Sequence, residues 1–218
     1  MLHKRCVFVY IFISFQLKKT MKEIWNNRYS KDDYVYGKEP NDFFAEQLQK
    51  IKPGTILLPC EGEGRNAVFA ASIGWNVIAF DQSESGKEKA LALAKEKSVS
   101  VNYIISDAVD FELQNNSVDI VAFIYAHFPV AIRKLIHQKV IDWIKPNGIV
   151  IMEAFNQNQL KNNSGGPKDL SMLYTKEILS NDFNLLKTEL LQYSEIELKE
   201  GNLHQGIADV IRYVGRKM

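Results

Sequence analysis

Two glycines and an aspartate are the residues of this chain best placed to hold a nucleotide-like ligand. Gly62 and Gly64 lie between the apolar run Thr55–Leu58 and the helical pattern Asn66–Ser72, which predicts a strand, a tight loop and a helix. Glycine permits positive φ angles and lets a ligand lie against backbone N–H groups. Asp81 ends the next apolar stretch, where its carboxylate can accept hydrogen bonds from two ribose hydroxyls. The pattern indicates an adenosine-type cofactor, and its alternative is a plain tight connection.

Two histidines are placed where they could take a proton from a substrate. His127 follows the predicted strand Val118–Tyr125, and His204 lies in the connection between the last two predicted strands. An imidazole near neutrality is a suitable general base. The alternatives are a His127 bonded to backbone at a helix entry and a His204 exposed on a hairpin. We expect His137, inside a predicted helix, to face the surface.

Composition sets limits on partners and compartment. The chain has 218 residues, of which 46% are hydrophobic, and 27 Lys and Arg against 26 Asp and Glu give a net charge of +1. No segment gathers the basic residues among aromatic ones, so we expect no nucleic-acid partner. Cys6 and Cys60 are the only cysteines, too few for a disulfide framework or a metal site, so we expect no metal and a cytoplasmic protein.

Residues 1–20 form a predicted extension ahead of one domain, residues 21–218. Their apolar run, Cys6–Phe15, is too short to span a bilayer and is followed by no small-residue cleavage pattern. We therefore expect no membrane association, and we interpret Met21 as the natural start.

Strand-like and helix-like stretches alternate through most of the chain. This order predicts an α/β fold with three layers, a doubly wound, Rossmann-like and mostly parallel sheet that ends in an antiparallel hairpin. The predicted strands are Thr55–Leu58, Asn76–Phe80, Val101–Ile105, Val118–Tyr125, Ile149–Phe155, Leu185–Lys199 and Gly206–Lys217. The predicted helices are Asn41–Ile51 with Asn41 as its cap, Asn66–Ser72, Ser85–Lys97, Val130–Ile144 and Thr175–Ser180 with Thr175 as its cap.

Several motifs in this order resemble one known family. They are Tyr34–Phe44, Gly62–Val68, Phe80–Ser83, Ser106–Ala108 and Leu135–Phe155 around Lys145-Pro146-Asn147-Gly148. The chain resembles the class I S-adenosylmethionine-dependent methyltransferases, within them the branch similar to tellurite-resistance and thiopurine-type methyltransferases. The resemblance implies a seven-stranded sheet whose last strand is antiparallel to its neighbours.

The resemblance also implies a binding role for eleven residues. It places the methionine moiety of S-adenosyl-L-methionine on the glycine loop, the ribose and adenine on the loops after the next two strands, and the sulfonium near the fourth strand. In chain order these residues are Pro59, Cys60, Glu61, Gly62, Gly64 and Arg65 for the methionine, Asp81 and Gln82 for the ribose, Asp107 and Ala108 for the adenine, and Tyr125 for the sulfonium. Asp107 has an alternative role, capping Val109–Phe111.

The loop departs from the family pattern, and an aromatic segment precedes it. Leu58 and Cys60 stand where the family usually has an acidic residue and a first glycine.

Trp25, Tyr29 and Tyr36 are predicted to fold over the cofactor, where aromatic faces favour a cationic sulfonium. Their alternative is to seal the hydrophobic edge of the sheet.

The sequence therefore predicts an enzyme that moves a methyl group to a small-molecule thiol, amine, oxyanion or metalloid by in-line displacement. One alternative is an NAD(P)-dependent oxidoreductase, because Gly62–Ala67 also satisfies the permissive G-x-G-x-x-A form. A second is a noncatalytic module that only binds S-adenosylmethionine. The oligomeric state, monomer or homodimer, is left open.

Overall fold

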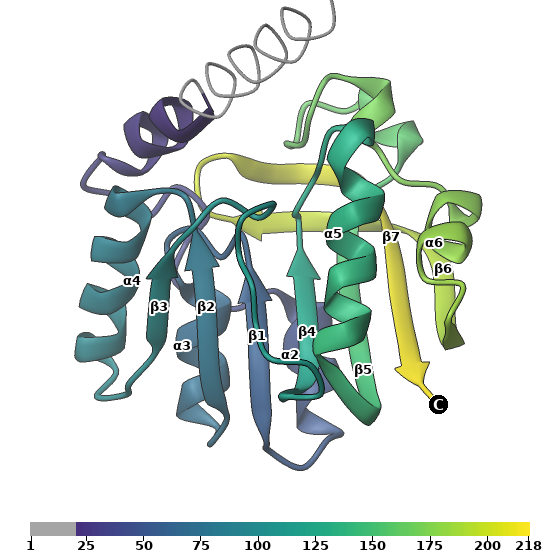
Figure 1. Cartoon of the computed structure of the whole chain (residues 1–218). Coiled ribbons are helices and arrows are strands. Elements are labelled where there is room, and N and C mark those ends of the chain that lie inside the picture. Colours follow the sequence, from purple (N-terminus) through teal and green to yellow (C-terminus); the bar gives the residue numbers. More distant parts are fainter. Residues whose placement is uncertain (1–20) are drawn as a thin grey trace, which may run out of the picture.

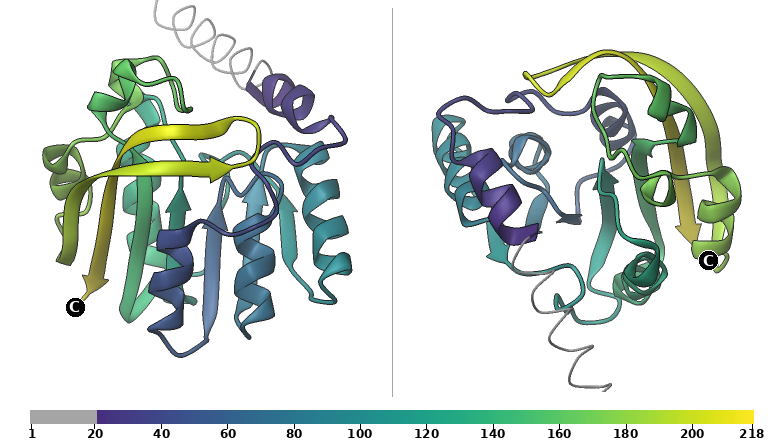
Figure 2. Two further views of the ribbon diagram at one scale, coloured as in Figure 1. Left: turned by 180° about the vertical axis from the view of Figure 1, so that it is seen from behind. Right: turned by 90° about the horizontal axis from the view of Figure 1, so that it is seen from above.

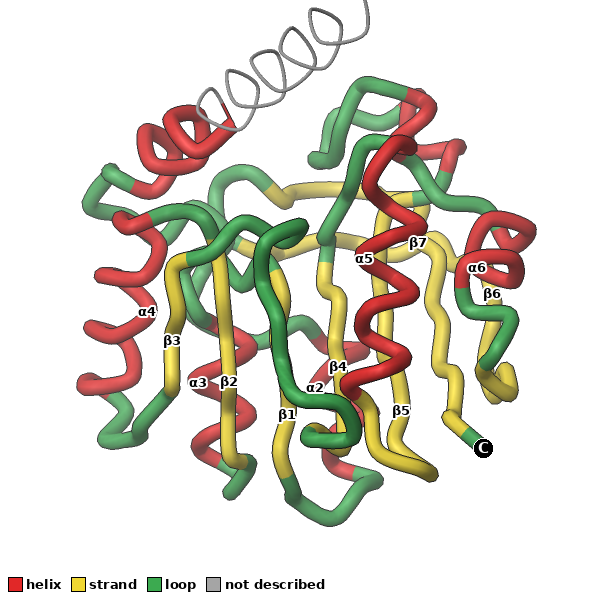
Figure 3. Tube along the Cα trace, in the orientation of Figure 1, coloured by secondary structure: helices red, strands yellow, loops and turns green. Residues whose placement is uncertain are grey.

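A computed structural model describes residues 21–218, and the predictions for residues 1–20 lie outside the described residues. The centre is a seven-stranded sheet in the order β3-β2-β1-β4-β5-β7-β6 (Figures 1 and 3). Strands β1 to β5 are parallel to their neighbours, whereas β7 runs antiparallel to both β5 and β6. The bounds are Thr55–Pro59, Asn76–Asp81, Asn102–Ile105, Val118–Ile124, Ile144–Phe155, Leu186–Glu200 and His204–Lys217 for β1 to β7. The predicted α/β fold and antiparallel hairpin are confirmed.

Helices cover both faces of the sheet. Helices α2 (Asp42–Gln49), α3 (Arg65–Ser72) and α4 (Glu84–Glu96) lie on one face, and α5 (Val130–Trp143) and α6 (Lys176–Asp182) on the other (Figure 2). Each layer buries its own apolar cluster against the sheet. Two-sided burial explains why the central strands are continuous apolar runs rather than alternating ones.

Side-chain caps fix where the helices begin. The Asn41 side chain accepts a hydrogen bond from Phe44 N at 3.0 Å, and Thr175 Oγ1 accepts one from Ile178 N at 3.1 Å. Both caps were predicted from sequence, since short polar side chains satisfy the free N–H groups of a first turn.

The β6–β7 hairpin is longer than predicted, and it reaches the functional edge of the sheet. Glu200 and His204 pair across its end, so the connection is only residues 201–203. Its far end curves over the carboxyl ends of the parallel strands (Figure 2), where Leu203 N donates to Val35 O at 3.2 Å. The hairpin therefore brings C-terminal side chains to an edge built by the first half of the chain.

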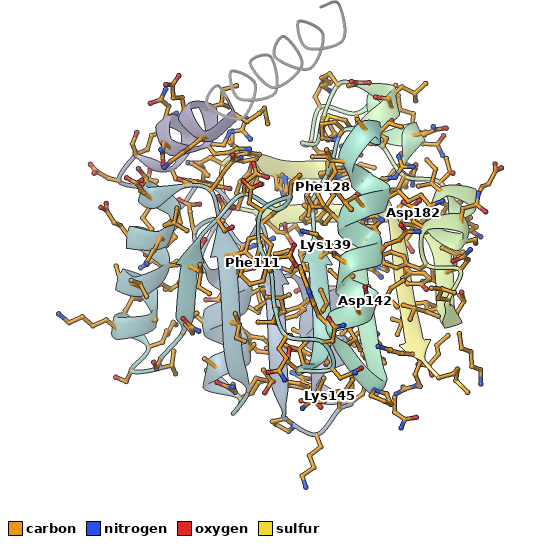
Figure 4. All side chains as sticks on the ribbon, viewed as in Figure 1. Phe111, Phe128, Lys139, Asp142, Lys145 and Asp182 are labelled. Atoms are coloured by element: carbon orange, nitrogen blue, oxygen red, sulfur yellow. The ribbon has the colours of Figure 1, made fainter. Side chains whose placement is uncertain are left out.

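Two predictions are wrong in detail. Residues 145–148 are not a turn between helix and strand, because β5 begins at Ile144 and these residues form an irregularity between the pairs Val118 with Ile144 and Ile120 with Ile149. His137 does not face the surface, since its side chain is 0% exposed. Its Nδ1 donates a hydrogen bond to Asp182 Oδ2 at 2.9 Å, and Asp182 ends α6 beside α5 (Figure 4). Helix α6 packs against α5 and buries a face of α5 that the α5 sequence alone predicts to be exposed.

None of the helices in residues 21–218 is both long and apolar enough to cross a membrane.

Candidate functional site

The glycine loop lies at the carboxyl edge, next to the position where the sheet order reverses between β1 and β4. Gly62 and Gly64 have φ angles of +57° and +85°. A Cβ on Gly62 would lie 2.6 Å from the Tyr29 hydroxyl oxygen, and one on Gly64 would lie 2.4 Å from Ala90 Cβ. Both glycines are therefore needed for backbone conformation and for close approach.

Asp81 lies beside this loop, where the sequence predicted it. Its carboxylate accepts hydrogen bonds from Gly62 N at 3.1 Å and Ser83 N at 2.9 Å, and the residue is 7% exposed. Burial raises the pKa of Asp81 to about 6, and the backbone donors only partly oppose this. An ionised carboxylate has about four acceptor positions, so lone pairs remain for ribose hydroxyls. Gln82 follows it and is half-buried.

Asp107 and Ala108 follow β3 on the neighbouring loop. Ser106 N donates to Asp81 O at 3.0 Å, which joins the two loops. Asp107 Oδ1 accepts from Val109 N at 2.8 Å, so the predicted alternative of a local cap is present in the structure. The cap uses one carboxylate oxygen and leaves the other to accept from an adenine amine.

Glu61 and Cys60 of the glycine loop have structural contacts. Glu61 Oε1 accepts from Ala67 N at 2.7 Å in the first turn of α3, and burial raises its pKa to about 7. Cys60 has φ +56° and follows Pro59 at the end of β1. Burial and three nearby carboxylates raise the pKa of the Cys60 thiol well above its usual value, which opposes a thiolate at neutral pH.

An aromatic segment covers the glycine loop. Residues 21–29 are helical, and their Trp25 and Tyr29 rings stack with centroids 5.5 Å apart, while Tyr29 and Tyr36 meet edge to face at 6.4 Å. Ser83 Oγ donates to Asn26 Oδ1 at 2.7 Å, which fastens this helix to the start of α4. Tyr29 is buried against Gly62, so this one of the three predicted covering aromatics lies directly over the loop.

A second group of polar side chains lies at the far end of the hairpin. Arg65, the first residue of α3, donates to Glu200 Oε2 at 2.8 Å and to Glu39 O at 3.3 Å. His204 Nδ1 lies 3.1 Å from the same Glu200 oxygen. The pKa of Glu200 falls to about 2, because bonds from His204 and the Arg65 guanidinium outweigh burial. The guanidinium contacts of Arg65 are thus with the hairpin and with backbone.

Tyr125 connects this group to the sheet. It has φ +54°, its ring stacks on Phe155 at 4.7 Å, and its hydroxyl donates to Glu153 Oε1 at 2.9 Å. Glu153 is fully buried and also accepts from Asn41 Nδ2 and Arg212 Nε, both at 2.6 Å. The sequence reasoning missed Glu153 and Glu200. A single acid inside the apolar strand and an acid four residues before His204 were the available signals.

His127 is held by backbone through both ring nitrogens. Nδ1 lies 2.8 Å from Met172 O, and Nε2 accepts from Phe155 N at 3.2 Å. These contacts fix the neutral tautomer with the proton on Nδ1. Burial lowers the pKa of His127 to about 4. The geometry matches the backbone-bonded alternative for this residue.

His204 has a different environment. Its ring lies 4.5 Å from Tyr36 and 4.7 Å from Tyr125, centroid to centroid, and the residue is 5% exposed, so the exposed-hairpin alternative is wrong. Burial lowers its pKa, while Glu200 opposes that shift. Within the described residues Nε2 makes no hydrogen bond, yet it is not among the fully enclosed atoms that lack a partner. Of the four ring nitrogens of His127 and His204, it is the one without a hydrogen-bond partner among the described residues, so it can accept a proton from a substrate.

Among residues 21–218 there is no cluster of three or more His, Cys, Asp or Glu side chains able to hold a metal ion. The carboxyl edge of the sheet thus combines the glycine loop, the carboxylates of Asp81 and Asp107, and the His204 imidazole, whose Nδ1 is hydrogen-bonded to Glu200.

Comparison with known proteins gives one family. Residues 56–148 match the methyltransferase domain family. The chain is 33% identical over 96 residues to the ubiquinone biosynthesis O-methyltransferase of Rickettsia canadensis, a match that covers 44% of this chain and 40% of that enzyme. The chain thus matches less than half the length of this curated relative.

Solved structures share the fold over a larger part of the chain. One, described for the conversion of a disulfide bond into a thioacetal group during echinomycin biosynthesis, has a TM-score of 0.73 and 15% identity and covers 90% of this chain and 92% of its own. TehB from Haemophilus influenzae has a TM-score of 0.67 and 13% identity, with 90% and 67% covered. At such identities the likeness shows the fold alone.

Proposed function

We propose that the chain is an S-adenosylmethionine-dependent methyltransferase that transfers a methyl group from S-adenosyl-L-methionine to a small-molecule acceptor, because residues 56–148 match the methyltransferase domain family. The observation that carries the proposal is the extent of the family match. Residues 56–148 include the glycine loop, Asp81, Asp107 and Tyr125, which are the positions that the local geometry favours for the cofactor.

The chemistry of the donor set fits an adenosine cofactor. Asp81 keeps acceptor positions for ribose hydroxyls, and Asp107 keeps one oxygen for the adenine amine. We assign Ala108 N to a ring nitrogen of the adenine and Gln82 to the ribose edge. We assign the methionine moiety to Pro59, Cys60, Glu61, Gly62, Gly64 and the main chain of Arg65, because the Arg65 guanidinium is already paired with Glu200.

When bound, S-adenosylmethionine supplies an activated methyl group, and the protein has to align an acceptor in line with it and exclude water. Tyr29 covers the loop with Trp25 stacked on it, and the Tyr36 and Tyr125 rings lie beside His204. His204 Nε2 is the group we assign to proton removal. His127, bonded to backbone on both nitrogens, instead holds the start of the segment before α5.

A surface hollow lies between the covering segment and the hairpin turn, and its lining includes none of the residues assigned to the cofactor or to proton removal. A cavity of about 600 Å³ is lined by residues of the covering segment and of the hairpin turn, which are Ile24, Asn27, Arg28, Lys31, Asp32, Asp33, Val35, Asn202 and Leu203. Arg28 also donates to the Tyr36 hydroxyl at 2.9 Å, and Leu203 precedes His204.

The proposal is tested by binding and transfer. Calorimetry should show binding of S-adenosylhomocysteine and no binding of NADH, because the family match gives the oxidoreductase alternative no support. Labelled S-adenosylmethionine should then pass its methyl group to a member of a panel of thiols, phenols, amines, oxyanions and metalloid anions. Binding without transfer to any of them would favour the noncatalytic module, and tight NADH binding alone would overturn the proposal.

A further inference from the structure

We infer that Glu200 is a positioning residue that holds His204 as the general base, and that the methyl acceptor therefore enters with a weakly acidic O–H or S–H. The inference rests on the proposed methyl transfer and deepens it, because it specifies the acceptor class. A base is needed only where the acceptor loses a proton, whereas tertiary amines, pyridines and halides react without one.

The geometry of the pair supports this assignment. Glu200 and His204 are cross-strand partners at the end of the β6–β7 hairpin, and Glu200 Oε2 lies 3.1 Å from His204 Nδ1. A carboxylate on Nδ1 fixes the proton there and leaves the lone pair on Nε2. Nε2 then faces the 162–168 loop, where a Cβ on Gly165 would lie 3.1 Å from it and 2.6 Å from His204 Cδ2. Glycine at 165 is therefore needed for this loop to pack against the Cδ2–Nε2 edge of the ring, because a side chain there would clash with it.

Two side chains besides His204 hold Glu200 in place. Arg65 donates to Oε2 at 2.8 Å, and Asn41 Nδ2 lies 3.2 Å from Oε1. Both Arg65 and Glu200 are largely buried, with exposed side-chain fractions of 8% and 14%. A carboxylate that is fixed by a guanidinium stays charged and cannot rotate away from the imidazole.

The charged and titratable groups around His204 come from every element that packs on it. They are Glu200 from β6, Arg65 from α3, Arg28 from the helical segment 21–29, Tyr36 from the following loop, and Tyr125 and His127 from the segment after β4. Only Glu200 among them favours the protonated imidazole directly, because Arg65 and Arg28 repel it. Glu200 therefore decides how well His204 can take a proton.

The proton balance of the transfer is simple. His204 Nε2 takes the proton from the acceptor oxygen or sulfur as that atom bonds to the methyl carbon. The carbon–sulfur bond breaks, and its electron pair stays on the sulfur of S-adenosylhomocysteine. The imidazolium that remains is paired with Glu200 and returns its proton to solvent when the products leave.

The test compares Glu200→Gln with two matched variants. Glu200→Asp keeps the carboxylate, and Glu197→Gln removes an exposed carboxylate from the same strand. NMR titration of the histidine ring, assigned with His204→Gln, measures the His204 pKa. Methyl transfer is measured to 4-nitrophenol and thiophenol, which carry a proton, and to pyridine and iodide, which carry none. S-adenosylhomocysteine binding is measured alongside.

We expect Glu200→Gln to lower the His204 pKa, shift the acid limb of the kcat/KM profile to lower pH, and slow transfer to phenol and thiol by about 10²-fold. Transfer to pyridine and iodide and binding of S-adenosylhomocysteine should stay close to those of the unchanged protein, as should all properties of Glu197→Gln. Glu200→Asp should restore the pH limb. His204→Gln leaves the Arg65–Glu200 pair intact and tests the same step if Glu200→Gln does not fold.

An unchanged His204 pKa or equal losses on both acceptor types would overturn the inference, as would transfer to proton-free acceptors alone. In that last case the proposed function stands. Transfer to neither type, with S-adenosylhomocysteine bound, would instead defeat the proposed function.

Discussion

Two buried carboxylates at the same edge of the sheet behave in opposite ways. Asp81, beside the glycine loop, has a pKa raised to about 6, whereas Glu200, at the hairpin end, has one lowered to about 2. Both accept good hydrogen bonds, but Asp81 receives them from backbone N–H groups and Glu200 from Arg65 and His204. Backbone dipoles only partly offset desolvation here, and a nearby cation exceeds it.

The opposite pKa shifts of Asp81 and Glu200 suit two different functions. A site for neutral ribose hydroxyls needs an acceptor whose remaining lone pairs are free, and Asp81 has no cationic partner among the described residues to occupy them. A site that orients a base needs a carboxylate with a fixed charge, which the Arg65 ion pair gives Glu200. The cofactor end of the edge is built from loops, and the proposed acceptor end from buried side-chain pairs.

The largest effect that would test this comparison is on stability. Glu200→Ala leaves the guanidinium of Arg65 buried without its carboxylate, so we expect the free energy of unfolding to fall by about 3 kcal/mol or more. Chemical denaturation at pH 7 measures it. The exposed Glu197→Ala on the same strand should change stability by no more than about 0.5 kcal/mol. Equal losses in the two variants would remove the distinction between the buried Arg65–Glu200 pair and the exposed Lys199–Glu197 pair.

At the cofactor end the largest effect should be on binding. Asp81→Ala should weaken S-adenosylhomocysteine binding by roughly 1.5–3 kcal/mol through lost charge-assisted hydrogen bonds, with the fold retained. The fold is retained because a buried acid with a raised pKa does not stabilise the folded state at neutral pH. Calorimetry measures the dissociation constant and circular dichroism the fold. An unchanged constant would exclude Asp81 from the site.

The pH dependence of binding separates the two acids further. Asp81 is ionised above about pH 6 and protonated below it, so affinity for S-adenosylhomocysteine should fall as pH drops, by at most about tenfold per unit. Glu200, with a pKa of about 2, contributes nothing to this change between pH 7 and 5. Calorimetry on Asp81→Asn, which does not titrate, should give a flat profile, and a profile parallel to that of the unchanged protein would assign the effect elsewhere.

The smallest expected effect concerns the buried pair away from the site. Burial lowers the pKa of His137 despite its bond to Asp182, so the unfolded chain takes up a proton that the folded chain does not as pH falls below about 6.5. The stability of the unchanged protein should therefore decline more than that of His137→Phe between pH 7 and 5.5, by at most about 1 kcal/mol. Gln138→Ala, on the exposed side of α5, is the control. If the stability of His137→Phe and of Gln138→Ala fell equally between these pH values, His137 would bind as many protons in the folded protein as in the unfolded chain.

Local patterns determined most of the architecture. The apolar runs of the central strands, the caps at Asn41 and Thr175 and the positive-φ glycines are properties of short stretches, and the structure contains them all. Asp81 at a strand end followed from the same local reasoning, because the carboxyl ends of parallel strands share one edge.

Long-range packing decided the rest. Whether His127 or His204 has a free nitrogen depends on Met172, Phe155 and Glu200, which lie on other elements or across a turn. His137 is buried because α6 packs against a helix face that its own segment leaves open. Burial and partners set the state of an imidazole or a carboxylate, and both come from residues distant along the chain. The sequence by itself thus determined the strands, the glycine loop and the types of side chain at the site. Tertiary structure decided which of those side chains are charged, hydrogen-bonded or free to react.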